Sequence, residues 1–169
     1  MDIPSIGIGR SEVRPRLASP ADQEALWANL EVIDVIATDH APHTLEEKDG
    51  ENPPPGYPGL ETALPLLLTA VHEGRLSMDD LIQRMVIRPR QIFSIPEQPE
   101  TWVEVNENEE WEIKAVNNFS RCGWTPFEGR KVRGRVSRVM LRGVEVFHDQ
   151  QILALPGYGK NIRQTSLYL

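Results

Sequence analysis

This sequence predicts an α/β region followed by a small β region, and three observations favour that fold class. A capped helical pattern over about 20–30 runs directly into the β-branched segment Val32–Ala37. Two more helical patterns follow a proline-rich loop at 44–58. After about residue 98, polar and apolar residues alternate as they do in antiparallel strands. Helices that alternate with buried strands are typical of α/β proteins.

The first predicted helix has a clear start. Ser19 is a suitable N-cap, and Pro20 suits the first helical position because its fixed φ is already helical. Directly after the helix, Val32–Ala37 carries few charges, which is typical of a strand buried on both faces of a parallel sheet. Asp39 would then lie just past the C-terminal end of that strand, at the edge where α/β barrels place catalytic groups.

The middle of the chain predicts a loop and two helices. Pro53–Pro55 lies in a polar context that neither a helix nor a sheet interior tolerates, so 44–58 is expected to be a loop. The apolar pattern resumes with helical spacing over Leu60–Glu73. Ser77 caps a further helix, which Pro89 is expected to end.

The C-terminal β region is predicted from period-two alternation. An acidic stretch, Glu107–Glu112, is expected to be a solvated turn. Basic residues at alternate positions from Arg130 to Arg138 could contact an acidic partner, although a solvated sheet face is favoured. The segments that alternate are Thr101–Val105, Trp111–Ile113, Val132–Leu141 and Val144–Phe147.

Composition excludes several classes of function. The formal charge of −7 over 169 residues opposes general binding to nucleic acid or to an anionic membrane. The longest apolar stretch, Ala63–Val71, is far too short to span a bilayer. A single cysteine, Cys122, excludes an intrachain disulfide and is expected to be a structural thiol. With no signal-peptide pattern at the N-terminus, a cytoplasmic protein is expected.

One cluster of chemically capable residues stands out, in Asp39-His40-Ala41-Pro42-His43. A carboxylate and two imidazoles within five residues could supply a zinc ligand, a general base and a group that holds an anion. A purely structural reading, in which Asp39 caps the following turn, stays open. A metal site made by His40 and His43 is disfavoured, because a catalytic zinc usually takes three protein ligands.

The cluster is also one of several motifs that resemble those of a known family. Its sequence resembles the Asp-His-Ala-Pro-His signature of dihydroorotases in the amidohydrolase superfamily. Other motifs match, in the same order, the dihydroorotase domain of the animal multifunctional protein that fuses carbamoyl-phosphate synthetase, dihydroorotase and aspartate transcarbamoylase. The resemblance runs from about Glu12 to Arg163. The matching motifs are Glu12–Pro15, Pro53–Thr62, Trp124–Gly129 and Pro156–Gly159.

The resemblance implies a fold and an activity. The implied fold is the C-terminal part of a TIM-barrel metal-dependent hydrolase followed by a small β region of a composite β-sandwich. Residues 1–11 would be a divergent N-terminal segment, 12–97 the last strand and helix units of the barrel, 98–160 the β region and 161–169 a tail. The implied reaction is the zinc-dependent interconversion of N-carbamoyl-L-aspartate and dihydroorotate in pyrimidine biosynthesis.

The resemblance also implies roles for particular residues. Asp39 would be a zinc ligand and the acid/base that transfers a proton to the ring nitrogen. Arg14 and His43 would bind the substrate carboxylate, and backbone groups of Pro55 and Gly56 would contact the pyrimidine ring. A guanidinium suits a carboxylate, and a Pro-Gly turn allows close approach of the backbone. Taken without the resemblance, Arg14 is more simply a surface ion-pair residue, and Pro55 and Gly56 are turn residues.

Other family features are absent from this sequence. It contains no His-x-His motif, so Asp39 would be the only zinc ligand it supplies. We therefore expect a fragment that is inactive alone and that associates with the full-length enzyme or with copies of itself. Two alternatives stay open: a non-catalytic interaction module with the same fold, and a dihydropyrimidinase-like relative.

Overall fold

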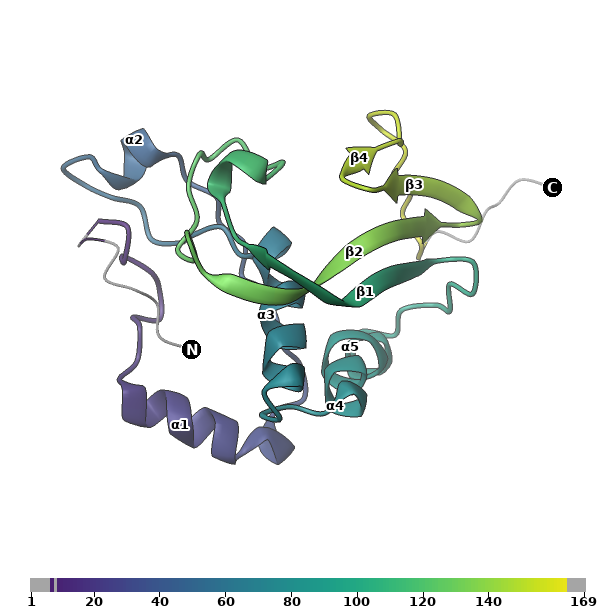
Figure 1. Ribbon diagram of the computed structural model, residues 1–169, viewed down its shortest axis with the longest axis horizontal. Helices are drawn as coiled ribbons and strands as arrows, with labels where there is room; N and C mark the ends of the chain where they lie inside the picture. Colours follow the sequence, from purple (N-terminus) through teal and green to yellow (C-terminus); the bar gives the residue numbers. More distant parts are fainter. Residues whose placement is uncertain (1–6, 8, 164–169) are drawn as a thin grey trace.

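The computed structural model describes residue 7 and residues 9–163. The predictions for the N-terminal segment 1–11 and the tail 161–169 therefore lie largely outside the described residues. Helices gather in the first part of the described chain and a four-stranded antiparallel sheet follows, in the order β1-β2-β3-β4 (Figure 1). The helices are α1 (Pro20–Ala28), α2 (Leu45–Lys48), α3 (Leu60–His72), α4 (Met78–Ile82) and α5 (Arg88–Ile92), with short 3-10 or π turns at η1 (Leu30–Val32), η2 (Gln83–Ile87) and η3 (Ala115–Asn117). The strands are β1 (Trp102–Glu112), β2 (Lys131–Leu141), β3 (Val144–His148) and β4 (Gln151–Ile152).

Helix α3 is the centre of the core. It packs across β2 (Figure 1) and buries Leu66 against Ile113, Phe127 and Val132. A second cluster packs Leu67, Leu68 and Ala70 of the same helix against Leu76 and Leu81. The two clusters hold the helical part and the sheet together through one helix, so the position of α3 determines where the loops at its N-terminus lie. No helix in the described part of the chain is long and apolar enough to cross a membrane.

The predicted helices are present, with one correction. Ser19 caps α1 through a capping box with Asp22, and Ser77 caps α4 through its hydroxyl. The prediction that Pro89 ends the last helix was wrong, because α4, η2 and α5 follow one another without a break. Pro89 lies in the first turn of α5, directly after the π turn η2.

The predicted strand over Val32–Ala37 is not a strand. Residue Val32 ends η1, and residues 33–40 follow without regular structure. A strand in a parallel sheet needs neighbouring strands for its hydrogen bonds, and β1 to β4 pair only with one another. The backbone at Ile36 instead donates to the carbonyl of Arg84, with an N···O distance of 3.2 Å.

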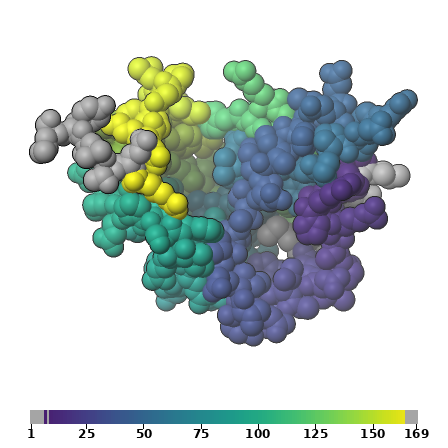
Figure 2. Space-filling view, turned by 180° about the vertical axis from the view of Figure 1, so that it is seen from behind, coloured from purple at the N-terminus to yellow at the C-terminus, as the bar shows by residue number. Residues whose placement is uncertain are grey.

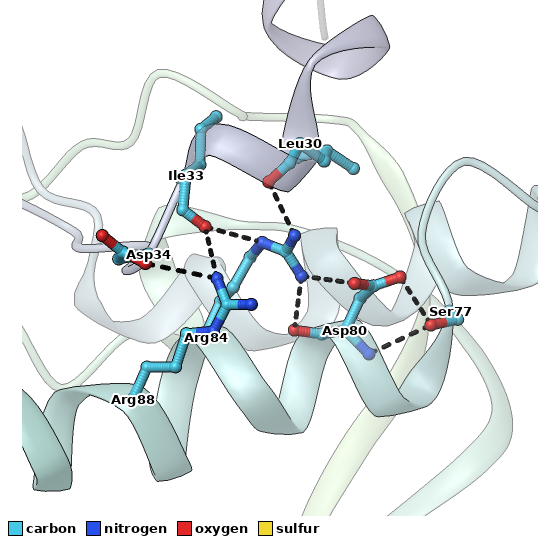
Figure 3. Close-up of polar contacts among 7 residues, drawn as sticks. All are labelled: Leu30, Ile33, Asp34, Ser77, Asp80, Arg84 and Arg88. Atoms are coloured by element: carbon cyan, nitrogen blue, oxygen red, sulfur yellow. Dashed lines mark hydrogen bonds and ion pairs between the residues drawn. The ribbon is translucent and has the colours of Figure 1, made fainter.

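The side chain of Arg84 fixes this irregular segment (Figure 3). It is 3% exposed and donates from Nε to the Ile33 carbonyl at 3.0 Å and from Nη2 to the Leu30 carbonyl at 2.6 Å. Its Nη1 pairs with the Asp80 carboxylate, which also accepts from the Ser77 hydroxyl at 2.7 Å. The segment that leads to Asp39 is therefore held by α4 and η2 rather than by a sheet.

The predicted β segments lie largely in β1, β2 and β3, two of them within β1, whereas β4 was not predicted and the acidic stretch was assigned wrongly. Glu107–Glu112 forms the second half of β1 instead of a turn, and Glu110 pairs with Arg133 in the ladder. Arg133 and Arg135 of β2 make ion pairs with Glu110 and Glu109, the latter at 2.6 Å. The acidic partner of the basic strand is thus the neighbouring strand of the same chain, since opposite charges across a ladder stabilise the pairing.

This charge pairing predicts a pH dependence. The hydrogen bond and charge of Arg133 lower the pKa of Glu110 below its ordinary value. A carboxylate with a lowered folded-state pKa stabilises the fold above its unfolded pKa, and this contribution is lost as the pH falls through the folded value. We expect the stability difference between the wild type and Glu110→Gln to shrink between about pH 5 and about pH 3. Urea unfolding at several pH values measures this stability difference, and Glu107→Gln on the same strand is the control. If the stability difference for Glu107→Gln shrinks equally over this pH range, the effect does not come from the pairing of Glu110 with Arg133.

Candidate functional site

Asp39 lies in a loop that runs along the segment around Tyr57. The residue adopts a left-handed backbone, with a φ of 44°, a conformation that aspartate tolerates better than most residues. The next residue but one, Ala41, donates its N–H to the Tyr57 carbonyl at 3.1 Å. Burial, and after it the charge of Asp39, raises the pKa of Tyr57. The hydrogen bond from Ala41 thus holds the loop of Asp39 beside Tyr57.

His40 has a structural role that the sequence did not suggest. Its Nδ1 accepts hydrogen bonds from the N–H groups of Gly59 at 3.1 Å and Leu60 at 3.2 Å. These are among the first N–H groups of α3, which have no partner within the helix. With Nδ1 as the acceptor, the geometry assigns the ring proton to Nε2. His40 thus caps α3, while the structure gives Asp39 no such capping contact.

His43 is held from two sides. Its carbonyl accepts a hydrogen bond from the indole Nε1 of Trp124 at 2.7 Å, and its Nδ1 lies 3.8 Å from a carboxylate oxygen of Glu47. Glu47 belongs to the capping box that starts α2 at Thr44. The N–H of Thr44, followed by its hydroxyl, lowers the pKa of Glu47. The His43 side chain, which is 34% exposed, therefore lies beside a carboxylate that stays ionised.

Gly56 brings the proline-rich loop against this cluster. Its φ is 124°, and its N–H donates to the Glu12 carbonyl at 2.9 Å. A Cβ built on Gly56 would lie 2.5 Å from the Ala41 Cβ and 3.6 Å from Cδ2 of His43. No other residue type allows an approach this close. The structure thus brings the predicted residues His43 and Gly56 together, with Pro55 next to Gly56 in the chain.

Arg14 lies at the surface. Its side chain is 78% exposed, and its Nε is 4.0 Å from a carboxylate oxygen of Glu12. It makes no ion pair with Asp39, although Glu12, two residues before it, contacts Gly56 through its carbonyl. The segment that carries Arg14 is therefore attached to the cluster by its backbone, while the guanidinium faces solvent.

Two residues that organise this region were missed by the sequence analysis. Lys48 is fully buried, and its Nζ donates to the carbonyls of Glu12 and Pro54, both at 2.8 Å. Trp124 is buried and holds the His43 carbonyl. The capping box Thr44-x-x-Glu47 could have predicted α2, a helical turn within the expected loop. Nothing in a polar, charged segment could have predicted that Lys48 is buried.

The described residues contain no cluster able to hold a metal ion by themselves. Among them, no three His, Cys, Asp or Glu side chains lie close enough to share a metal. His40 uses Nδ1 for its helix cap, and Cys122 is buried with its sulfur 3.3 Å from the Trp124 carbonyl oxygen. A catalytic zinc needs about three protein ligands. The donor set within this part of the chain therefore does not suit zinc without ligands from outside it.

Three separate segments of the chain thus meet at one place. They are the segment at Glu12, the loop that carries Asp39 and His43, and the loop that carries Pro54 to Gly56. In Figure 2 the blue residues between about 30 and 60 lie between the purple N-terminal part and the teal helical part.

No family model matches the chain. Individual proteins, however, are similar in sequence to most of the chain.

The multifunctional protein pyr1-3 of Dictyostelium discoideum is 57% identical over 162 residues, which cover 96% of this chain and 7% of that protein. A dihydroorotase from Pyrococcus furiosus is 41% identical over 151 residues, which cover 86% of this chain and 36% of the enzyme. This chain is a homologue of the dihydroorotases. It spans about a third of the length of the dihydroorotases it matches. A match over 96% of the chain includes the region of Asp39, His43 and Gly56.

Solved structures agree on the fold. The inactive dihydroorotase-like domain of a Chaetomium thermophilum CAD-like multifunctional protein matches 83% of this chain and 40% of its own, with 33% identity and a TM-score of 0.68. The L-hydantoinase (dihydropyrimidinase) from Arthrobacter aurescens matches 85% of this chain and 35% of its own, with 30% identity and a TM-score of 0.79. The chain therefore shares its α/β fold with the matching parts of this dihydroorotase-like domain and this hydantoinase.

Proposed function

We propose that this chain supplies one wall of a dihydroorotase active site and takes part in the interconversion of N-carbamoyl-L-aspartate and dihydroorotate when joined to the rest of such an enzyme. The observation that carries the proposal is the close approach of Gly56 to Ala41 and His43, where a Cβ on Gly56 would lie 3.6 Å from Cδ2 of His43. Residues 12–97 would belong to the barrel and 98–160 to the β region. The working location would be the cytoplasm.

The proposal gives each predicted residue a role. Asp39 would be one ligand of a zinc ion completed by residues outside the described chain, and would hold the proton that ends on the ring nitrogen. The exposed guanidinium of Arg14 has only a long ion pair with Glu12, at 4.0 Å, so a substrate carboxylate can replace the Glu12 carboxylate. His43 would donate to the same carboxylate, and the backbone at Pro55 and Gly56 would border the ring.

The test joins this chain to the upstream part of the Dictyostelium relative. We expect the joined protein to open the ring of dihydroorotate, and Asp39→Asn to lower kcat by a factor of about a thousand or more. Asp34→Asn is the matched control, because Asp34 is an exposed aspartate paired with Arg88 at 3.4 Å. A joined protein that hydrolyses dihydrouracil but not dihydroorotate would instead support the dihydropyrimidinase-like alternative.

A second function is favoured by one specific finding. The related domain from Chaetomium thermophilum is described as inactive, so this fold also occurs without catalysis. In that case the chain would be an interaction module that binds an intact dihydroorotase or a second copy of itself. Sedimentation of the chain alone and mixed with an intact dihydroorotase at micromolar concentration tests this. Independent sedimentation of both proteins, with the chain as a monomer, would exclude it.

A further inference from the structure

Lys48 lies where the three segments of the candidate site meet. Its ammonium donates to the Glu12 carbonyl, two residues before Arg14, and to the Pro54 carbonyl, which precedes Pro55 and Gly56. Both N···O distances are 2.8 Å. The same Glu12 carbonyl accepts the N–H of Gly56. One side chain therefore joins the segment of Arg14 to the loop of Gly56.

The third connection runs to His43 through Trp124. The Lys48 ammonium lies 5.9 Å from the centre of the Trp124 ring, within the range in which a cation is attracted to an aromatic face. The indole N–H of Trp124 donates to the His43 carbonyl. Leu45, in the first turn of α2, donates its N–H to the Cys122 carbonyl in the same loop as Trp124. The loop of the β region thus reaches back to the candidate site.

That loop is itself fixed to α3. The Glu61 carboxylate accepts the N–H groups of Phe119 at 2.8 Å and Ser120 at 2.9 Å. Since His40 caps the same end of α3, this helix end connects the Asp39 loop to the loop that carries Trp124. The position of His43 is therefore set by contacts that converge from α2, α3 and the β region.

Burial makes these contacts interdependent. An ammonium removed from water must keep its hydrogen bonds to oxygen atoms, because an unpaired buried charge is unfavourable. Lys48 is fully buried, and its ammonium donates to two backbone carbonyls. Displacing either the Glu12 segment or the Pro54 loop would leave the ammonium short of an acceptor. Each segment is thus held in place by the other.

We infer that Lys48 is a positioning residue of the substrate site: its ammonium holds the segments of Arg14, Gly56 and, through Trp124, His43 at fixed separations. It would not touch the substrate. The inference rests on the proposed function, because it assigns Lys48 to the substrate-binding wall of that same site. Its effect would be on how well the substrate carboxylate and ring are bound, and only weakly on proton transfer at Asp39.

The kinetic test uses the joined protein. We expect Lys48→Met to raise KM for dihydroorotate by about tenfold or more while kcat changes by less than about threefold. Lys114→Met is the matched control, because Lys114 is 52% exposed and pairs with Glu112 on the sheet. Trp124→Phe, which removes one donor and keeps a ring, is expected to raise KM in the same direction by a smaller factor. An unchanged KM in both site variants, or a fall in kcat alone, would overturn the inference.

Hydrogen exchange of the isolated chain tests the same inference without activity. We expect the Gly56 amide to exchange about tenfold faster or more in Lys48→Met, with the amides of Leu66 to Ala70 in α3 unchanged. Equal acceleration in α3 would indicate a merely structural role and would contradict the inference, as would unchanged exchange at Gly56. If the wild-type joined protein is inactive, the proposed function fails, while the exchange result still decides whether Lys48 holds the three segments together.

Discussion

Replacing Arg84 with methionine is expected to lower the free energy of unfolding by about 3 kcal/mol or more, the cost of leaving the partners of a buried charge unpaired. Methionine keeps the apolar volume but makes none of the bonds to the carbonyls of Leu30 and Ile33. The Asp80 carboxylate also loses its ion pair with Arg84 and keeps the hydrogen bond from the Ser77 hydroxyl. Urea unfolding followed by circular dichroism measures the change. In the joined protein, the same variant should lower activity, because the segment before Asp39 loses its support.

Arg88→Met is the comparison for this prediction. Arg88 contacts the same Ile33 carbonyl at 3.2 Å and pairs with Asp34, but its side chain is a third exposed, at 33%. Exposed ion pairs contribute little, so we expect a loss of about 1 kcal/mol or less. Arg84→Lys should fall between the two variants, because lysine keeps the charge without the planar fork. Equal losses of unfolding free energy for Arg84→Met and Arg88→Met would show that the burial of Arg84 does not increase its contribution to stability.

Replacing Gly56 with alanine is the second change with a large expected effect. A φ of 124° is strained for any residue with a Cβ, at about 1–3 kcal/mol. The added methyl would also lie 2.5 Å from the Ala41 Cβ, and such overpacking costs about 1–3 kcal/mol more. We expect the loop to move away from Ala41 and His43. Unfolding experiments should show the loss of stability, and the joined protein should lose dihydroorotate binding.

Two further variants separate strain from crowding at Gly56. Gly74 also has a positive φ, of 73°, but nothing lies within 4 Å of a Cβ added there, so we expect Gly74→Ala to lose about 1 kcal/mol. Adding Ala41→Gly to Gly56→Ala removes the atom that the new methyl would meet. The double variant should recover part of the stability, as a coupling between neighbouring sites. If it recovers none, the close approach to Ala41 does not limit the position of this loop.

Local signals in the sequence predicted the helices well. Ser19 and Ser77 each begin a helix because a side-chain oxygen accepts an N–H of the first turn, an effect that needs only nearby residues. The alternating segments formed strands for a similar reason, since their period of two gives one face to the core. The candidate loop at 39–43 and the turn at Gly56 were also identified from motifs, and the structure brings His43 and Gly56 together.

The errors share one physical cause, which is that their outcome depends on distant residues. Val32–Ala37 has the composition of a buried strand, yet it has no strand beside it and is fixed instead by Arg84. Glu107–Glu112 has the composition of a solvated turn, yet it forms part of β1. Two of its glutamates make ion pairs with Arg133 and Arg135 of β2. Composition describes a segment, whereas hydrogen-bond partners and counter-charges come from elsewhere in the fold.

The sequence by itself determined the family resemblance, the helices with their caps and the residues that carry candidate chemistry, because motifs and caps act over a few neighbouring positions. Only the tertiary structure decided which of these residues meet. In the fold, His40 caps the N-terminus of α3, Arg14 is exposed to solvent, and Lys48 is buried between the carbonyls of Glu12 and Pro54. A buried charge takes its partners from whichever segments the core brings within reach, and that is set by how α3 packs on the sheet.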